Sequence, residues 1–177
     1  METIKETKPS IYVGTYRKYN EGSIAGKWMD LTEFNDYEAF LSACKALHAD
    51  EEDPEYMIQD FEGFPKALYS ESGLPSEEDF DFIRTLAKSD KQEAFEAYLS
   101  YYGEVKDYSD AWERFEEVYQ GEYDSERSFA DQLADETIEG LAEGESTLAK
   151  YFDYEAFARD LFLGDYNFID GHVFICQ

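Results

Sequence analysis

YNFIDGHVFI, at residues 166–175, predicts a β-hairpin near the end of the chain. Apolar and polar residues alternate in both arms, and a two-residue Asp-Gly turn between such arms is among the strongest short-range hairpin signals. Two helices are expected before it, because Ser125 and Asp153 can each cap an amphipathic segment. Residues 122–177 are therefore predicted to form a C-terminal α+β subdomain of sheet plus helices.

A second sheet is predicted in the first third of the chain. IYVGTY at 11–16 alternates like a half-buried strand, KWMDL at 27–31 follows after a loop, and EYMIQDF at 55–61 resembles a third strand. Between the last two, apolar residues recur at helical spacing behind a candidate cap at Asn35 or Asp36, namely Phe40, Leu41, Cys44 and Leu47. We expect residues 1–72 to form an N-terminal α/β subdomain.

The middle of the chain, residues 73–121, has the pattern of a small helical module. One helix is expected to start near Ser76, a second to end at Gly103, and a third to run from Ser109 to Gly121. The predicted fold class is therefore α+β, with three small subdomains in line: a mixed sheet plus helix, a helical module, and a sheet plus helices ending in the hairpin.

The composition is acidic but typical of a folded protein. The 177 residues include 42 Asp and Glu against 15 Lys and Arg, which gives a formal net charge of -27. Acidic chains with few apolar residues stay disordered, but here 43% of residues are hydrophobic and 18% are aromatic. A folded chain is expected, with self-repulsion that added salt should relieve.

Neither cysteine suggests chemistry. Cys44 lies in an apolar helical pattern and Cys176 lies at the chain end, and neither fits a metal or redox spacing. The sequence shows no signal peptide and no apolar run long enough to span a bilayer. We expect a cytoplasmic protein without a cofactor, a metal or a membrane partner.

The negative charge is spread along the whole chain. Residues 1–74 carry 15 acidic and 7 basic side chains, residues 75–120 carry 13 and 5, and residues 121–177 carry 14 and 3. No segment is an acidic tail, so we expect the negative electrostatic field to extend along the whole folded protein. Duplex DNA carries one charge per 1.7 Å of axis, so a charge of -27 corresponds to about 46 Å of duplex.

Carboxylates three or four positions apart would form rows on the predicted helices, about 5–6 Å apart at Cβ. The third helix places Asp110, Glu113, Glu116 and Glu117 opposite its aromatic face. Such rows could stand in for phosphates, although solvated acidic faces and salt-loving organisms offer a plainer explanation. The candidate surface carboxylates are Glu51, Glu52, Asp53, Glu77, Glu78, Asp81, Glu93, Glu96, Asp110, Glu113, Glu116, Glu117, Glu122, Asp124, Glu126, Asp131, Asp135, Glu136 and Glu139.

Four segments resemble the ArdA antirestriction family, in the family's order. They are IYVGTYRKYNEGSIAGKWMDL at 11–31, EYMIQDFEGFP at 55–65, ERFEEVYQGEYDSERSFADQLADE at 113–136 and YFDYEAFARDLFLGDYNFIDGHVFI at 151–175. The third resembles the segment called the antirestriction motif. The chain departs from the family pattern in its extra residues before Ile11 and its loose spacing, which leaves the subdomain borders open by several residues.

The resemblance implies a protein that acts by binding and catalyses no reaction. Such a protein would be an elongated homodimer, shaped and charged like bent B-form DNA, that occupies the DNA-binding groove of a Type I restriction-modification enzyme at its methyltransferase core and does not itself bind nucleic acid. Relatives typically travel on mobile genetic elements, where they protect incoming DNA. If the motif segment also forms the dimer seam, Phe115, Tyr119 and Phe129 would pack there.

Two other classes of function stay open. Paired carboxylates could act as the acid and base of a hydrolase, but no feature singles out one pair, and the only histidines, His48 and His172, are not expected to be catalytic. The loop DEEDPE at 50–55 offers clustered oxygens for calcium, but it lacks the spaced ligands and central Gly of an EF-hand.

Overall fold

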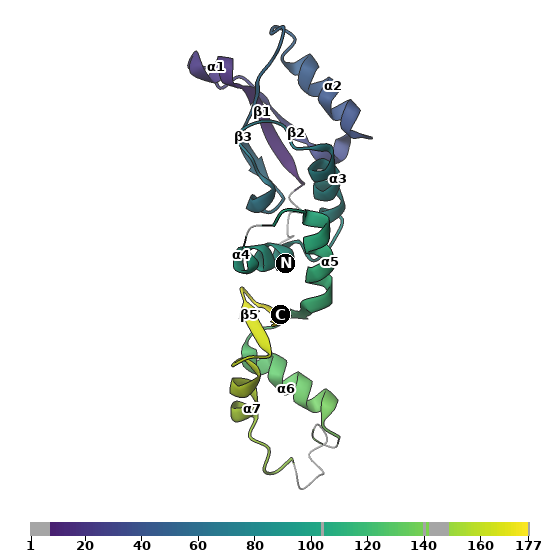
Figure 1. Ribbon diagram of the computed structural model, residues 1–177, viewed down its shortest axis with the longest axis vertical. Coiled ribbons are helices and arrows are strands. Elements are labelled where there is room, and N and C mark those ends of the chain that lie inside the picture. The colour runs from purple at the N-terminus through teal and green to yellow at the C-terminus, as the bar shows by residue number, and fades with distance from the viewer. Residues whose placement is uncertain (1–7, 104, 140, 142–148, 177) are drawn as a thin grey trace, which may run out of the picture. The chain divides into compact units, whose positions relative to one another are not determined.

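The computed structural model describes residues 8–103, 105–139, 141 and 149–176, and it divides the chain into two compact units, Met1–Glu96 and Ala97–Gln177. Over these described residues it contains seven α-helices and two antiparallel three-stranded sheets (Figure 1), so the predicted α+β class is confirmed. No helix in these ranges is long and apolar enough to cross a membrane. The arrangement in three subdomains stays a prediction.

The first unit is built on a sheet of order β2-β1-β3. Ser10 pairs with Asp30 on one side of β1 and with Glu62 on the other. All three strands were predicted, β1 from its alternation, whereas α1 was not predicted. The elements are β1 (Ser10–Thr15), α1 (Tyr16–Asn20), β2 (Lys27–Asp30), the 3-10 turn η1 (Leu31–Glu33), α2 (Tyr37–Leu47), β3 (Tyr56–Glu62), the 3-10 turn η2 (Lys66–Leu68) and α3 (Glu77–Leu86).

Side-chain caps explain where the helices of this unit begin. Asp36 accepts a hydrogen bond from the Ala39 amide at the start of α2, and Ser76 does the same for the Asp79 amide at the start of α3. Each cap satisfies a backbone donor that has no partner within the helix. Both capping residues were predicted, Asp36 as one of two candidates.

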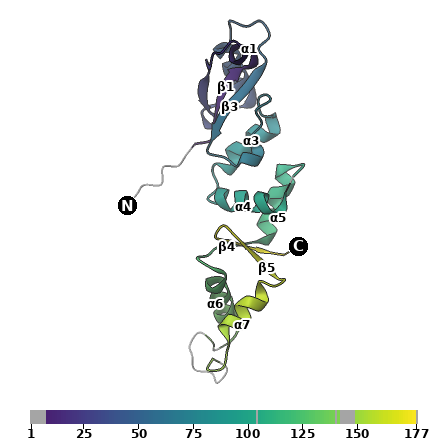
Figure 2. The ribbon, with the colours of Figure 1, turned by 90° about the vertical axis from the view of Figure 1, so that its left-hand side faces the viewer.

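An aromatic contact holds α2 against α3 in the core of the first unit. The rings of Phe40 and Phe80 stack at 5.2 Å between centroids, and both side chains are fully buried. Burying an aromatic side chain stabilises the fold by about 1.5–3 kcal/mol. Figure 2 shows α3 below the strands β1 and β3 of this unit.

The second unit contains a sheet of order β4-β6-β5. The predicted hairpin is confirmed, since Ile169 pairs with His172 across the turn and the two turn residues, Asp170 and Gly171, have φ values of 49° and 88°. Positive φ at both positions is the requirement of a type I′ turn. The elements are α4 (Gln92–Tyr102), within which the unit begins, α5 (Tyr108–Val118), β4 (Tyr119–Glu122), α6 (Glu126–Thr137), α7 (Tyr154–Leu161), β5 (Tyr166–Ile169) and β6 (His172–Ile175).

The prediction that the third helix continues to Gly121 is wrong. α5 ends at Val118, and Tyr119 begins β4, in which it pairs with Phe174 of β6. The Tyr119 ring stacks on Phe115 at 5.0 Å and lies 5.6 Å from the Phe174 ring. A strand contact across 55 residues of chain therefore overrides the helical spacing, which Tyr119 happens to satisfy.

Candidate acidic binding surface

Helix α5 separates its acidic side chains from its apolar ones. Ala111, Phe115 and Val118 are buried, and the carboxylates on the rest of the helix are exposed: Asp110, Glu113, Glu116 and Glu117. Asp107 caps the helix by accepting hydrogen bonds from the amides of Ser109 and Asp110. Packing of the buried face holds the helix in place. The carboxylates therefore point outward and form a row on its exposed face.

Three carboxylates of that row carry an uncompensated charge. Within the described part of the chain, no Lys, Arg or His nitrogen lies within 4.0 Å of the carboxylates of Asp110, Glu113 or Glu117. Like charges at this helical spacing destabilise an isolated helix by a few tenths of a kcal/mol per pair. Their hydrated oxygens hold a counterion atmosphere that a cationic partner can displace.

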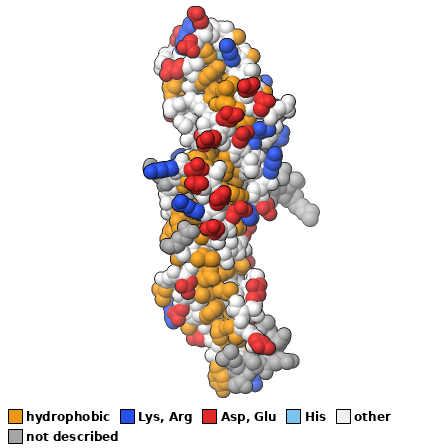
Figure 3. Space-filling view, turned by 45° about the vertical axis from the view of Figure 1, so that its right-hand side comes forward, with side chains coloured by type: hydrophobic (Ala, Val, Ile, Leu, Met, Phe, Trp, Pro, Cys, Tyr) orange, Lys and Arg blue, Asp and Glu red, His pale blue; other side chains and the backbone are white. Residues whose placement is uncertain are grey.

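Most other predicted surface carboxylates are also exposed, on several elements of both units. Asp81 is the partly compensated one, with an oxygen 3.5 Å from the Arg84 guanidinium. Figure 3 shows Asp and Glu side chains interspersed with apolar ones over the face that it presents. The exposed residues of this group are Glu52, Asp53, Glu77, Glu78, Asp81, Glu93, Glu96, Glu122, Asp124 and Glu126.

The carboxylates of α6 are held by neighbouring side chains. Arg127 pairs with Asp131 at 2.5 Å, and Asp131 is half-buried. Asp135 accepts a 2.9 Å hydrogen bond from the Tyr154 hydroxyl of α7, and this hydrogen bond to a carboxylate raises the pKa of Tyr154. Glu136 is exposed and accepts a hydrogen bond from Gln132, and Glu139 is exposed beyond the end of the helix. The acidic groups of α6 are thus more fixed in position than those of α5.

The ratio of acidic to basic side chains differs between the two units. Met1–Glu96 contains 22 acidic and 10 basic residues, whereas Ala97–Gln177 contains 20 and 5. The second unit therefore has the stronger field for its size. It is also the unit that contains the predicted antirestriction motif.

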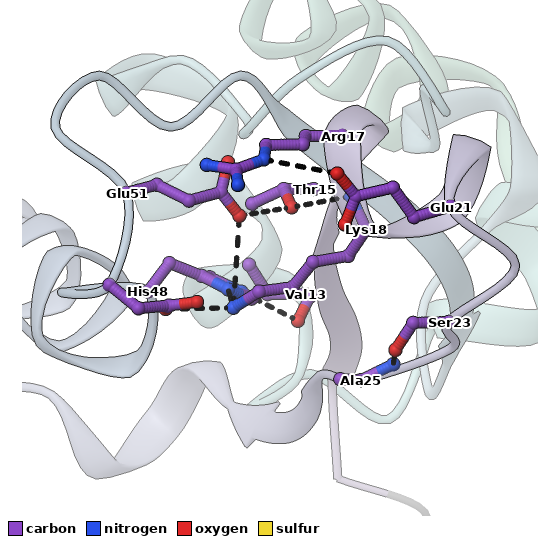
Figure 4. A network of polar contacts seen from close by, with 10 residues as sticks. Val13, Thr15, Arg17, Lys18, Glu21, Ser23, Ala25, His48 and Glu51 are labelled. Carbon is purple, nitrogen blue, oxygen red and sulfur yellow. Dashed lines mark hydrogen bonds and ion pairs between the residues drawn. The ribbon is translucent and has the colours of Figure 1, made fainter.

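Glu51 does not belong to the surface, contrary to prediction. Its side chain is only 5% exposed, and its Oε1 accepts a 2.7 Å hydrogen bond from the buried hydroxyl of Thr15 (Figure 4). The ammonium of Lys18 lies 3.7 Å from the same oxygen. An unpaired carboxylate would be costly to bury, so these two partners explain its position. Local sequence could not identify them, because they lie more than 30 positions away.

Lys18 lies at the centre of this polar cluster, in which Glu51 and His48 are buried and Asp50 is exposed. Its Nζ lies 2.9 Å from Asp50 Oδ1 and 3.0 Å from His48 Nδ1, and the hydrogen bond from Lys18 lowers the pKa of Asp50. An ammonium only donates, so Nδ1 of His48 must accept, which leaves its Nε2–H to donate to the Val13 carbonyl at 3.3 Å.

The same cluster contains the one described group of side chains with metal-ligand geometry. Single ligand atoms of His48, Asp50 and Glu51 lie within 4.8 Å of one another. The ammonium of Lys18 contacts all three residues, so it supplies the positive charge that a metal ion would otherwise provide. Two residues of the loop at 50–55, which was considered as an alternative calcium site, are therefore paired with a lysine.

The residues predicted to pack at a dimer seam lie in the interior of the second unit. Phe115 is 0% exposed and Phe129 is 4% exposed, and Phe129 contacts the rings of Tyr123 and Tyr166. Tyr119 is half-buried, and its hydroxyl oxygen lies 3.2 Å from Nδ1 of His172. Phe115 and Phe129 are thus used by the core of their own chain, and their proposed role across a seam is withdrawn.

Comparison with known families agrees with the resemblance in the sequence. The model of the family described as antirestriction protein (ArdA) matches residues 11–174. No curated protein matches the chain. Because the family match spans nearly the whole sequence, the chain belongs to the ArdA family of antirestriction proteins, which are inhibitors of restriction and not enzymes.

Proposed function

We propose that the protein is a DNA mimic that competes with DNA for the binding groove of a Type I restriction-modification enzyme, at its methyltransferase core. Membership of the antirestriction family supports inhibition of restriction, and the mechanism rests on the exposed carboxylates. The row on α5 carries the argument, because Asp110, Glu113 and Glu117 project from a rigid helix and lie beyond 4.0 Å of every described cationic nitrogen.

The physical basis is the exchange of counterions. A DNA-binding groove gains affinity because its Lys and Arg side chains release the cations condensed on phosphates. A dense set of fixed carboxylates holds a similar ion atmosphere, and the same groove can displace it. The helix fixes the backbone positions of these carboxylates before binding, so only their side chains must be ordered, which limits the entropic cost of association.

The proposal also includes the oligomeric state of the protein and the compartment in which it acts. We propose a homodimer, which would double the length of DNA that the charge can replace, and a partner interface formed by charge alone, without contact between the protein and nucleic acid. An inhibitor of this kind would act in the cytoplasm, where the host enzyme meets incoming mobile DNA. Sedimentation velocity at several concentrations tests the dimer.

A competition assay with a purified Type I methyltransferase tests the mechanism. Labelled duplex containing the recognition site is bound to the enzyme at low salt, and increasing amounts of the protein are added. The proposal predicts complete displacement at saturating protein, with an apparent affinity that falls steeply as salt rises. Failure to displace DNA at low salt would contradict it.

Two variants with the same net charge separate the effect of the acidic row from the effect of total charge on competition. The row variant is Asp110→Asn/Glu113→Gln/Glu117→Gln, and the control is Glu38→Gln/Glu62→Gln/Glu71→Gln, which changes three exposed acidic residues outside the proposed surface. Both remove three charges. The row variant should compete more weakly than the control. Equal loss in both would show that only the total charge matters.

A further inference from the structure

The edge strand β2 has backbone groups that are not used by its own sheet. The Leu31 amide donates to the Pro9 carbonyl at 2.9 Å, which fixes the alternation of the antiparallel ladder. By this alternation the backbone N–H and C=O of Met29 point toward β1. The N–H and C=O of Trp28 and the N–H of Asp30 point away from β1. β2 is the outer strand of the sheet, so these groups form a pairing edge that no described strand occupies.

A groove runs along this edge, between β2 and α2. Its volume is about 380 Å³, and it is lined by the whole of β2, by Glu33 and Phe34, and by the C-terminal half of α2. Figure 1 shows α2 alongside the sheet next to β2. The helix presents Ala43, Ala46 and Leu47 to the groove, and the two alanines leave room beside the strand. A volume of this size lies in the range of roughly 300–1,000 Å³ that is usual for ligand clefts.

Charge differs between the two ends of the groove. Lys27 is exposed at the start of β2, and Glu33 is exposed beyond its end. Asp30 lies at the Glu33 end but already pairs with Lys8 at 2.8 Å. A segment that pairs antiparallel with β2 would have its N-terminus near Glu33 and its C-terminus near Lys27. Charge complementarity therefore requires a basic residue at its N-terminal end and an acidic residue at its C-terminal end.

We propose that this groove binds an extended segment of another protein, added as a fourth, antiparallel strand to β2. Its backbone pairs with Trp28 and Asp30, its alternate apolar side chains enter the groove against Ala43, Ala46 and Leu47, and its terminal charges face Glu33 and Lys27. This is strand addition, in which the backbone gives affinity and the pocket gives specificity. It does not depend on the proposed function.

The probe is the peptide acetyl-Lys-Val-Thr-Val-Thr-Val-Asp-amide, titrated into the full-length protein labelled with ¹⁵N. Saturable shifts of the Trp28 and Asp30 amides are expected. A peptide of the same composition with Lys and Asp exchanged should bind about threefold more weakly, because both charged contacts become repulsive. Methylating alternate peptide nitrogens on the pairing side should abolish binding, since the donors are removed.

Two pairs of variants test the groove on the protein side. Trp28→Pro removes the outward N–H at a position where an edge strand tolerates proline, and Trp28→Ala keeps it, so the proline variant should bind about fivefold more weakly than the alanine variant. Ala46→Gln fills the groove, whereas Ser42→Gln adds the same side chain at another exposed position of α2. Only the Ala46 variant should lose binding.

Several outcomes would overturn the proposal. These are the absence of saturable shifts at millimolar peptide, equal binding of the charge-exchanged peptide, and equal binding by Ala46→Gln and Ser42→Gln. A change of sedimentation coefficient in Ala46→Gln without peptide would also overturn it, because the occupant of the groove would then be a second copy of this chain.

Discussion

The hydroxyl of Thr15 donates a 2.7 Å hydrogen bond to Oε1 of Glu51, and both side chains are buried. Thr15 also accepts a hydrogen bond from the Lys18 amide at the start of α1. One side chain thus connects the end of β1, the first turn of α1 and the loop after α2. The fold of the first unit depends on a carboxylate that the sequence suggested was on the surface.

Replacing Thr15 with Val should destabilise the protein by about 1–3 kcal/mol, because it leaves a buried carboxylate without one of its donors. Thr15→Ser keeps the hydroxyl and should lose less. Urea denaturation followed by circular dichroism measures the free energy of unfolding of each variant. Equal stability of Thr15→Val and the parent chain would show that Lys18 alone compensates Glu51.

Gly26 should not tolerate a side chain. A Cβ there would lie 2.4 Å from the Val13 carbonyl oxygen and 2.7 Å from a Tyr12 ring carbon, so the backbone between β1 and β2 must shift. We expect Gly26→Ala to lower the unfolding free energy by about 3 kcal/mol. Gly164→Ala is the control, since a Cβ there meets nothing within 4 Å, and it should be neutral or slightly stabilising. Thermal denaturation of both variants provides the comparison.

The two cysteines should differ in reactivity. Cys44 is fully buried, and burial raises its pKa to about 12, whereas Cys176 is half-buried. The thiolate is the reactive form, so a thiol reagent at pH 8 should label Cys176 first and Cys44 only on unfolding. Cys176→Ser should leave the native protein almost unlabelled. Rapid labelling of that variant in its native state would contradict the burial of Cys44.

The raised pKa of Cys44 also predicts a direction for alkaline stability. The folded-state pKa lies above the ordinary thiol value of 9.0, so the unfolded chain releases this proton first. The contribution of the thiol to stability is present below pH 9 and is lost as pH rises toward about 12. Cys44→Ala should flatten the fall in unfolding free energy above pH 9, measured in urea at several pH values.

The local sequence pattern predicted those parts of the fold that depend only on residues close together in the sequence. The Asp170-Gly171 turn and the caps at Ser76, Ser125 and Asp153 are all observed, because each depends on residues within a few positions. β4 was missed, since YQGE lacks alternation and is a strand only through its pairing with β6.

The candidate surface was predicted unevenly for the same reason. Helical spacing placed the carboxylates of α5 outward correctly, because the opposite face is apolar. Glu51 lies in the acidic loop at 50–55 and was placed on the surface for its charge, but its burial depends on Thr15 and Lys18 from another part of the chain. The family resemblance suggested Phe115 and Phe129 for a dimer seam, although their contacts with Phe174 and Tyr166 lie within the core of one unit.

Added salt should stabilise the folded protein. At a net charge of -27 the carboxylates repel one another, and a Debye length of about 10 Å at 0.1 M screens that repulsion. The midpoint of thermal unfolding should therefore rise between low and moderate sodium chloride. The row variant Asp110→Asn/Glu113→Gln/Glu117→Gln should have a higher midpoint at low salt than the parent chain. Its midpoint should rise less as salt is added. A midpoint that falls with salt would mean that attractive ion pairs dominate.

Inhibition should depend on the acidic row as a group. In the competition assay, Glu113→Gln alone should weaken the protein by less than about threefold, because one exposed charge contributes little to a distributed field. The triple row variant should lose more and should show a shallower dependence of log affinity on log salt, by roughly one unit or more, since fewer counterions are released. An abrupt loss from Glu113→Gln alone would instead indicate one specific contact, in which case the carboxylates could not be acting as a continuous substitute for phosphates.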